Sequence, residues 1–185
     1  MFPRLALFSV SFLWGISFVF TKGYFHVLNP IVFTAYSFLM SGFFFLSIVL
    51  FRGKKFSFRL REGVLLGILL FFMEASQNIG LSKTTAANTA FITALGVLLI
   101  PFLEWVLYRH KIKLVTFAAL AVAFWGMHLL TGGIQNFNEG DMWIAVAAIG
   151  CLFYMVYSEH FEKEKKSDMA VLCSQQFLAV GFISL

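Results

Sequence analysis

The sequence has little charge and few residues that could bind a metal or attack a substrate. Asp, Glu, Lys and Arg make up 12% of the 185 residues, and the chain contains 2 cysteines, 4 histidines and 3 prolines. Cys151 and Cys173 fall inside apolar segments, so they predict neither a disulfide nor a metal site. The histidines lack a spacing such as H-E-x-x-H, and no G-x-x-x-x-G-K-[ST] or G-x-S-x-G motif occurs. We therefore expect no cofactor, no metal and no enzymatic activity.

Apolar residues are correspondingly abundant. They make up 60% of the chain, which includes 25 phenylalanines and has a mean hydropathy of +0.86. A water-soluble domain has about 45–50% apolar residues and could not bury this much apolar surface. The composition therefore predicts an integral membrane protein. The net charge of +5 comes from short basic clusters between apolar runs, a pattern that does not indicate nucleic-acid binding.

Six apolar runs are long enough to be membrane-spanning helices, which need about 20 residues to cross a core of about 30 Å. They cover Leu5–Thr21, Ile31–Phe51, Gly63–Leu81, Ala86–Tyr108, Leu114–Thr131 and Asp141–Ser158, and a seventh run starts near Met169 and reaches Leu185. The first run lacks a signal-peptidase site and more spans follow it, so we interpret it as a helix. Backbone groups in lipid must be satisfied internally. The prediction is an all-α polytopic transmembrane helix bundle, with six complete helices and the start of a seventh.

The basic residues also predict an orientation. Of the 14 Lys and Arg residues, all except Lys22 and Lys83 precede the first span or follow the second, fourth or sixth span. These positions lie on one side of the membrane, so the positive-inside rule places the N-terminus in the cytoplasm. Gly63 and Gly67, together with Ala86, Ala87 and Ala90, offer small-residue faces where helices can approach closely.

Residues 13–46 resemble residues 151–184 at a shift of about 137 positions. Each segment has an aromatic helix, a short polar link and a second helix with a polar residue about one third of the way along. The two segments are five helices apart, an odd number, so they would cross the membrane in opposite directions. Inverted repeats are usual in secondary transporters, with the binding site near the midplane between them. The alternative, that any two helix pairs share such a layout, stays open.

The segment "FFMEASQNIG" places a carboxylate inside the third apolar run. Counting from Gly63 puts Glu74 roughly 16 Å into the membrane, where a bare charge costs at least about 2.5–3.5 kcal/mol. It should therefore be protonated, paired or turned toward a cavity. Gln77 and Asn78 follow at i+3 and i+4, on the same helix face. This face is either functional, as a proton-titrating coupling site or a contact for a substrate ammonium group, or a hydrogen-bonded pin between helices.

Other residues are weaker candidates. Trp14 and Trp125 both count to mid-depth, where they could form an aromatic wall for an organic solute or simply pack in the bundle. Three further polar residues could line a cavity or bond across helices: Asn88, Thr89 and Thr93. We expect Asp141 to cap the sixth helix, and Glu104 to be a solvated carboxylate near the inner interface.

Four stretches, in order along the chain, carry a family likeness. "FLWGISFVFTK" is similar to a first-helix W-G-x-x-F-x-x-x-K pattern, and Asn29–Pro30 opens the second helix. "IGLSKTTAANTAFITALGVLLIPFLEWVLYRHKI" resembles an A-L-x-x-T-S-A-A-N-A-x-x-x-x-x-x-P stretch, and Gly140–Asp141 resembles the entry into a second repeat. With these motifs the chain resembles EamA-type members of the drug/metabolite transporter superfamily. One departure is Ser37, where that family often has Arg.

The resemblance implies a ten-helix fold of two inverted five-helix repeats that exports or imports small metabolites. On that pattern, residues 1–134 form the first repeat and residues 140–185 begin an incomplete second one. We therefore expect a fragment or a truncated reading frame.

The predicted function is a secondary transporter that moves a small metabolite, amino-acid-like or another organic solute, by alternating access in the bacterial plasma (inner) membrane. The alternative is a non-transporting membrane remnant or an assembly subunit. The expected partners are a small-molecule substrate, protons as a candidate coupling ion, the lipid bilayer and, if the chain is naturally short, a second copy of itself. The candidate substrate or coupling residues are Glu74, Gln77, Asn78, Trp14, Trp125, Asn88, Thr89 and Thr93.

Overall fold

The computed structural model describes residues 2–53, 60–109, 112–133, 136–165 and 168–185, of which residues 2–4, 130, 131, 160 and 162–165 are described by their backbone alone. The helices are α1 (Phe2–Tyr24), α2 (Pro30–Phe51), α3 (Leu60–Lys83), α4 (Ala86–Leu98), α5 (Ile100–Tyr108), α6 (Leu114–Thr131), α7 (Glu139–Lys165) and α8 (Met169–Ile183). Within these ranges there is no strand, and the predicted all-α fold is confirmed.

Five helical stretches of the described residues are long and apolar enough to cross a membrane. They are Leu5–Tyr24, Pro30–Phe51, Leu60–Lys83, Ala86–Tyr108 and Glu139–Glu159, whereas α6 and α8 are apolar but shorter. The stretch Ala86–Tyr108 is bent, because α4 ends at Leu98 and α5 begins at Ile100. Pro101 explains the bend, since it has no N–H for the carbonyl four residues earlier and its ring crowds that carbonyl.

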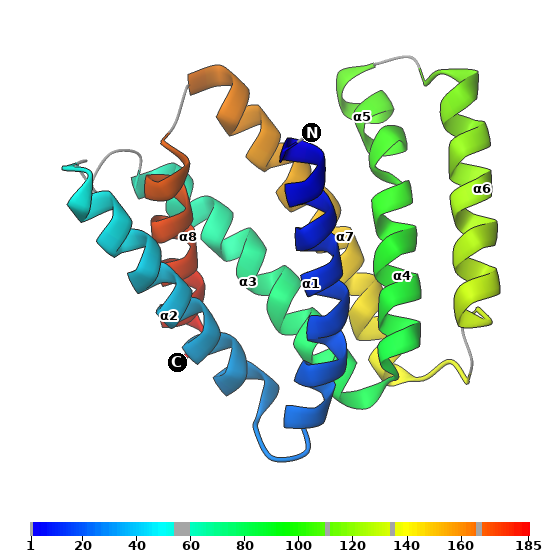
Figure 1. Ribbon diagram of the computed structural model, residues 1–185, viewed down its shortest axis with the longest axis horizontal. Coiled ribbons are helices and arrows are strands. Elements are labelled where there is room, and N and C mark those ends of the chain that lie inside the picture. The colour runs from blue at the N-terminus through cyan, green and yellow to red at the C-terminus, as the bar shows by residue number, and fades with distance from the viewer. Residues whose placement is uncertain (1, 54–59, 110–111, 134–135, 166–167) are drawn as a thin grey trace.

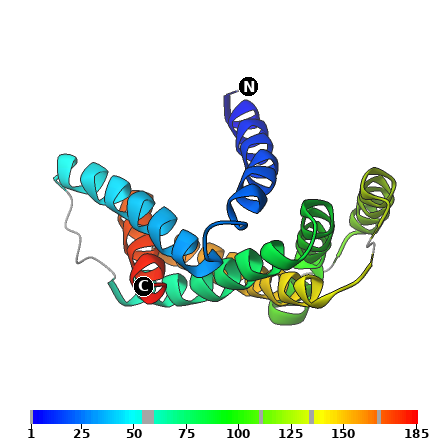
Figure 2. The same ribbon diagram turned by 90° about the horizontal axis from the view of Figure 1, so that it is seen from below.

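Helices from distant parts of the chain form the packed layer of the molecule. Helix α7 packs along α3 and α4, and α8 packs against both α2 and α3. Seen from below, α3, α7 and α8 lie together while α1 projects from the layer (Figures 1 and 2). Only 6% of the apolar stretch of α1 is buried, against 56% for α3. The two segments that resemble each other in sequence therefore differ in environment: α7 and α8 are packed, and α1 is largely open.

Two apolar clusters join α7 to its neighbours in this layer, and a third, formed by Val49, Ala170 and Val171, joins α2 to α8. Leu70 and Met73 of α3 meet Cys151 of α7 and Val180 of α8 in one cluster. The other joins α3, α4 and α7 and consists of Leu81, Phe91, Ile92 and Ile144. Helices α3 and α7 both contribute to each of these two clusters and pack along each other, so this pair forms the centre of the described fold.

Helices α2 and α8 pack through two reciprocal leucine–glycine contacts. A Cβ added at Gly181 would lie 2.6 Å from Leu39 Cγ, and a Cβ added at Gly42 would lie 2.8 Å from Leu178 Cγ. Leu178 and Gly181 each stand 139 positions after Leu39 and Gly42. Equivalent residues of the two helices thus exchange roles across an antiparallel interface, the pattern that a local two-fold axis produces.

The predicted small-residue face of α3 is also a packing surface. A Cβ at Gly63 would lie 2.5 Å from Gln175 Cβ, and one at Gly67 would lie 2.6 Å from Ala179 Cβ. The backbones of α3 and α8 can approach this closely only because both positions are glycine.

The helix ends that carry basic residues gather at one end of the molecule. The N-terminus, the end of α2, the start of α3 and the α5–α6 link all lie at the upper end in Figure 1, and the α1–α2 and α3–α4 links lie at the opposite end. Arg52, Arg61, Arg109 and Lys113 therefore share one end, as the alternation of spans predicts. Other members of these clusters lie outside the described residues: Lys54, Lys55, Arg59, Lys111 and Lys166. That this end is cytoplasmic stays a prediction.

Candidate functional site

The polar face of α3 lines a cavity of about 300 Å³. Glu74, Gln77, Asn78 and Leu81 all contribute to its wall, at the i, i+3, i+4 and i+7 spacing of one helix face. Gln77 and Asn78 are buried, whereas Glu74 is half-buried. The three polar residues singled out in the sequence therefore share one wall of the cavity, in the middle and C-terminal thirds of the helix.

Helices α1 and α2 supply the other walls, each from residues on one helix face. From α1 come Trp14, Ser17, Phe18 and Thr21, and from α2 come Phe33, Thr34, Ser37 and Phe38. Apart from Trp14, sequence analysis did not find these residues as part of the site. Their hydroxyl groups gave no signal comparable to that of Glu74, Gln77 and Asn78, because Ser and Thr can bond to their own helix backbone and are tolerated on any helix face in lipid.

Asn78 ties two walls of the cavity together. Its Nδ2 donates a hydrogen bond to Thr34 Oγ1 (2.9 Å), and that hydroxyl donates to the Pro30 carbonyl oxygen (2.8 Å). Thr34 is fully buried and Asn78 is 5% exposed. Of the two interpretations of the polar face, the pin therefore applies to Asn78, while the half-buried carboxylate of Glu74 lines the open space.

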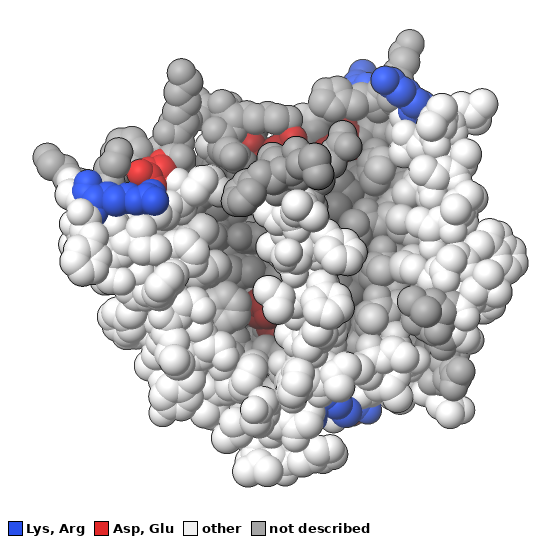
Figure 3. Space-filling model, in the orientation of Figure 1, with Lys and Arg blue, Asp and Glu red and all other residues white. Residues whose placement is uncertain are grey.

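Glu74 is the single ionisable group among the described residues that line the cavity. Lys22, one residue beyond Thr21, instead donates a hydrogen bond from Nζ to the Ser82 carbonyl oxygen (2.9 Å). On this face of the molecule, charged side chains gather at the two ends, and the broad middle is uncharged except for acidic atoms in a hollow beside α1 (Figure 3). The site thus combines one carboxylate with neutral hydrogen-bonding groups and aromatic rings.

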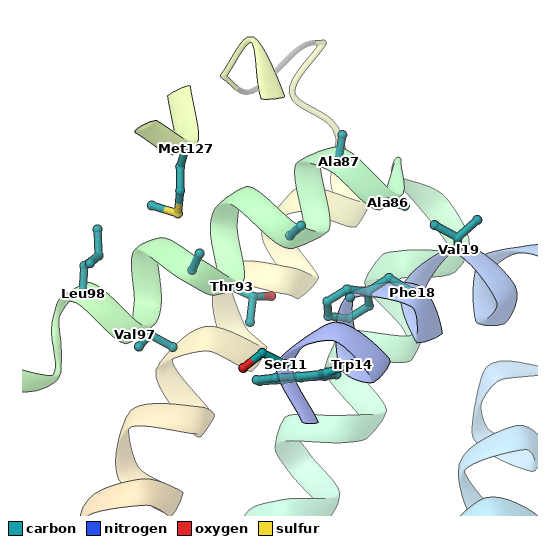
Figure 4. A pocket seen from close by; sticks show the side chains of 13 residues that line it. Ser11, Trp14, Phe18, Val19, Ala86, Ala87, Thr93, Val97, Leu98 and Met127 are labelled. Atoms are coloured by element: carbon teal, nitrogen blue, oxygen red, sulfur yellow. The ribbon is translucent and has the colours of Figure 1, made fainter. Parts of the chain in front are cut away.

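A larger, apolar groove of about 550 Å³ adjoins this cavity. It runs between α1 and α4, with Met127 of α6 at its edge, and Figure 4 shows Trp14 and Phe18 on its α1 side and Thr93 on its α4 side. Trp14 and Phe18 line both spaces, and their ring centroids are 6.2 Å apart. Thr93 is 7% exposed, and its Oγ1 has no hydrogen-bond partner among the described residues.

Asn88 belongs to a different place, a buried polar junction of α3, α4 and α7. Its Nδ2 donates hydrogen bonds to Asp141 Oδ1 (3.1 Å) and Oδ2 (3.3 Å), and Thr84 Oγ1 donates to Asp141 Oδ1 (2.5 Å). Asp141 is fully buried. Of the two roles considered for Asn88, it therefore takes the cross-helix bond.

The expected capping role of Asp141 needs correction. The residue before α7 is Asn138, whose Oδ1 accepts hydrogen bonds from the backbone N of Gly140 (2.7 Å) and of Asp141 (3.3 Å). Asp141 Oδ2 in turn accepts one from the backbone N of Asn138 (2.9 Å). This is a capping box in which Asn138 is the N-cap and Asp141 the third helical residue. The predicted cap was three residues late: Asn138 and Asp141 are both residue types that cap helices, and the helix begins at Glu139.

The remaining candidates lie outside the Glu74 cavity. Thr89 is fully buried. Its hydroxyl donates a hydrogen bond to the carbonyl oxygen of Thr85, the N-cap residue of the same helix (2.9 Å). Trp125 is 60% exposed on α6, where it contacts Phe124 and His128. The two tryptophans expected to form one wall are thus placed on different surfaces, and only Trp14 is beside the carboxylate.

A family model and a curated relative both match this chain, and both are described as transporters. The EamA-like transporter family model matches residues 1–132. A curated protein of Archaeoglobus fulgidus, described as an uncharacterized transporter, is 30% identical over 184 residues. The alignment covers 100% of this chain and 57% of that relative, so the chain spans a little over half of the relative's length. No solved structure matches the chain.

Proposed function

The chain belongs to the EamA-like transporter family, and on that premise we propose that it carries the binding site of a secondary transporter for a small organic solute. The proposed site is the cavity between α1, α2 and α3. The observation that carries the proposal is that Glu74 and Gln77 line a cavity whose other walls are hydroxyl and aromatic groups of α1 and α2. Ionisable groups within membrane-spanning segments are costly and mark solute or ion pathways.

Alternating access between two inverted repeats is the proposed mechanism. The reciprocal contacts of Leu39 with Gly181 and of Leu178 with Gly42 support a local two-fold relation between α2 and α8. Both helices also begin in the same way: Asn29 accepts a hydrogen bond from Ile31 N (2.9 Å), and Asp168 accepts one from Ala170 N (3.1 Å). We propose residues 1–134 and 140–185 as the first repeat and the beginning of the second, with the N-terminus in the cytoplasm.

Glu74 is the proposed coupling group. A carboxylate at this depth can take up a proton when the cavity faces one side and release it, or exchange it for the solute, when it faces the other. Two further titratable groups lie near it on α7: Cys151, in the apolar cluster with Met73, and Tyr154, whose hydroxyl donates a hydrogen bond to Gln176 Oε1 (2.9 Å). Tyr154 is engaged in that bond, so the coupling role falls to the carboxylate.

Transport by the natural gene product, reconstituted in proteoliposomes with a pH gradient, tests the proposal. Uptake of radiolabelled amino acids, nucleosides and quaternary ammonium ions would be compared between the wild type, Glu74→Gln and Glu104→Gln. Glu104 is a matched control because it is a carboxylate within the bundle, on α5, that does not line the cavity. We expect Glu74→Gln to lose gradient-driven uptake and Glu104→Gln to keep it. Equal rates and equal pH dependence in all three proteins would refute the role of Glu74.

A further inference from the structure

We propose that the solute is an amphipathic organic cation, with its charged group beside Glu74 and its apolar body in the groove between α1 and α4. This inference rests on the proposed function and narrows it to a class of substrate. It uses a relationship between two spaces that the transport proposal does not need: the carboxylate-bearing cavity and the apolar groove share Trp14 and Phe18 as a common wall.

The charged group that lines the cavity favours a solute of the opposite charge. Glu74 supplies a carboxylate, and no Lys, Arg or His is among the described residues that line the space. A cation would compensate the carboxylate in a low-dielectric site, whereas an anion would add a second uncompensated charge. A zwitterion would place its own carboxylate among neutral hydroxyl and amide groups, with no described cation to pair with it. The charge balance thus favours a solute with net positive charge.

The aromatic rings select the kind of cation. Trp14, Phe18, Phe33 and Phe38 all line the cavity. Aromatic faces attract organic cations through the ring quadrupole, and they do so for ammonium groups that carry alkyl substituents as well as for bare ones. Divalent metal ions are usually held by several charged or strongly donating side chains, and among the described residues no group of three His, Cys, Asp or Glu side chains could hold one. An alkylated ammonium group therefore fits the chemistry of the walls better than a metal cation does.

The adjoining groove gives the solute its apolar part. Its α4 side is formed by small and aliphatic residues such as Ala87, Ala90 and Val97, and its volume of about 550 Å³ exceeds that of the polar cavity. Trp14 and Phe18 border both spaces, so the two spaces meet at these rings, and the proposed solute would extend across them. One end of such a solute would meet the carboxylate, and the other end would be covered by apolar side chains.

Binding measurements separate the two halves of the proposal. Isothermal titration of the natural gene product in lipid nanodiscs would use tetramethylammonium, butyltrimethylammonium and hexyltrimethylammonium, with hexyl sulfate as the anion of equal chain length. Burial of a methylene group is worth at most about a fourfold gain in affinity. We therefore expect hexyltrimethylammonium to bind at least about tenfold more tightly than tetramethylammonium, and hexyl sulfate not to bind.

Variants assign the effects to the two spaces. Glu74→Gln should abolish binding of all three cations. Ala87→Phe and, separately, Val97→Phe place bulk in the groove at exposed positions, so they should remove the chain-length gain and leave tetramethylammonium affinity within about twofold of wild type. Two exposed positions are used so that misfolding of one variant does not remove the test.

Several outcomes would overturn the inference. Equal affinity for tetramethylammonium and hexyltrimethylammonium would mean that the groove takes no part, as when a lipid acyl chain fills it. Binding of hexyl sulfate, or a chain-length gain that survives in both groove variants, would also contradict the proposal. If Glu74-dependent transport of an uncharged or zwitterionic solute is found while no ammonium ion binds, the cation class is wrong and the proposed transport function stands.

Discussion

Asn78 on α3 donates a hydrogen bond to Thr34 Oγ1 on α2 across 2.9 Å, and this bond joins two walls of the cavity that contains Glu74. The two partners are 44 positions apart in sequence and both are buried. A hydrogen bond between buried groups contributes to stability mainly because breaking it leaves one buried partner unsatisfied. It therefore provides a sensitive test of whether α2 and α3 pack as described.

The first prediction concerns that bond. Thr34→Val keeps the shape of the side chain but leaves Asn78 Nδ2 without this acceptor, which should destabilise the protein by about 1–3 kcal/mol. The double variant Thr34→Val, Asn78→Leu removes both partners and should recover much of the loss. Thermal unfolding in detergent, followed by far-UV circular dichroism, measures both. Additive losses in the double variant would show that the two residues do not interact.

The second prediction concerns the α2–α8 interface. Gly42→Ala adds a methyl group that would lie 2.8 Å from Leu178 Cγ and 2.9 Å from its backbone N, so the helices must separate. We expect a destabilisation of about 1–3 kcal/mol, and a similar loss for Gly181→Ala. Gly126→Ala is the control, since a Cβ there meets nothing within 4 Å; it should be neutral or stabilising by up to about 1 kcal/mol. Unchanged melting of Gly42→Ala would contradict the reciprocal contact.

The sequence predicted the features that depend on local periodicity. Apolar runs of about 20 residues located the spans, and the 3.6-residue period gathered Gln77 and Asn78 beside Glu74. Hydroxyl residues such as Ser17 and Thr34 gave no comparable signal, because Ser and Thr can bond to their own helix backbone and are tolerated on any helix face in lipid. Their place in the cavity became clear only when three helices were seen to share it.

Long-range packing accounts for what could not be predicted. Trp14 and Trp125 have the same counted depth, yet one lies at the cavity and the other is exposed on α6. The depth of a residue along a helix does not determine which neighbour its side chain faces. In the same way, the buried partners of the Asp141 carboxylate come from α4 and its preceding link, more than 50 positions earlier, so the sequence around Asp141 gave no sign of them.

The third prediction tests that buried carboxylate. Asp141→Ala removes the acceptor for Thr84, Asn88 and the backbone N of Asn138, and so breaks both the capping box and the junction of α4 with α7. The expected loss of stability is about 2–4 kcal/mol, the sum of a lost cap and unsatisfied buried donors. Glu139→Gln is the control: it alters the ion pair of Glu139 with Lys83, whose side chains are 67% and 45% exposed, and should change stability by at most about 1 kcal/mol. Equal melting temperatures of the two variants would contradict the assignment.

The fourth prediction separates the two tryptophans. Trp14→Leu removes an aromatic face that borders both the cavity and the groove, so it should weaken binding of tetramethylammonium by about threefold to thirtyfold. Trp125→Leu changes a side chain that is 60% exposed on α6 and should leave that affinity unchanged. Titration calorimetry in nanodiscs measures both. A loss in Trp125→Leu equal to that in Trp14→Leu would place the cation elsewhere.

The last prediction uses position 37, which holds Ser on the cavity wall formed by α2. Ser37→Arg would bring a guanidinium group into the space that contains the Glu74 carboxylate, and the two charges would compensate each other without a solute. We expect cation binding to fall by more than about tenfold, because the incoming ammonium group then meets a neutral pair. Ser37→Gln is the matched control, since it adds a long polar side chain without charge and should retain most of the affinity. If both variants bind equally weakly, space rather than charge limits the site, and if both bind as the wild type does, the carboxylate is not the group that holds the cation.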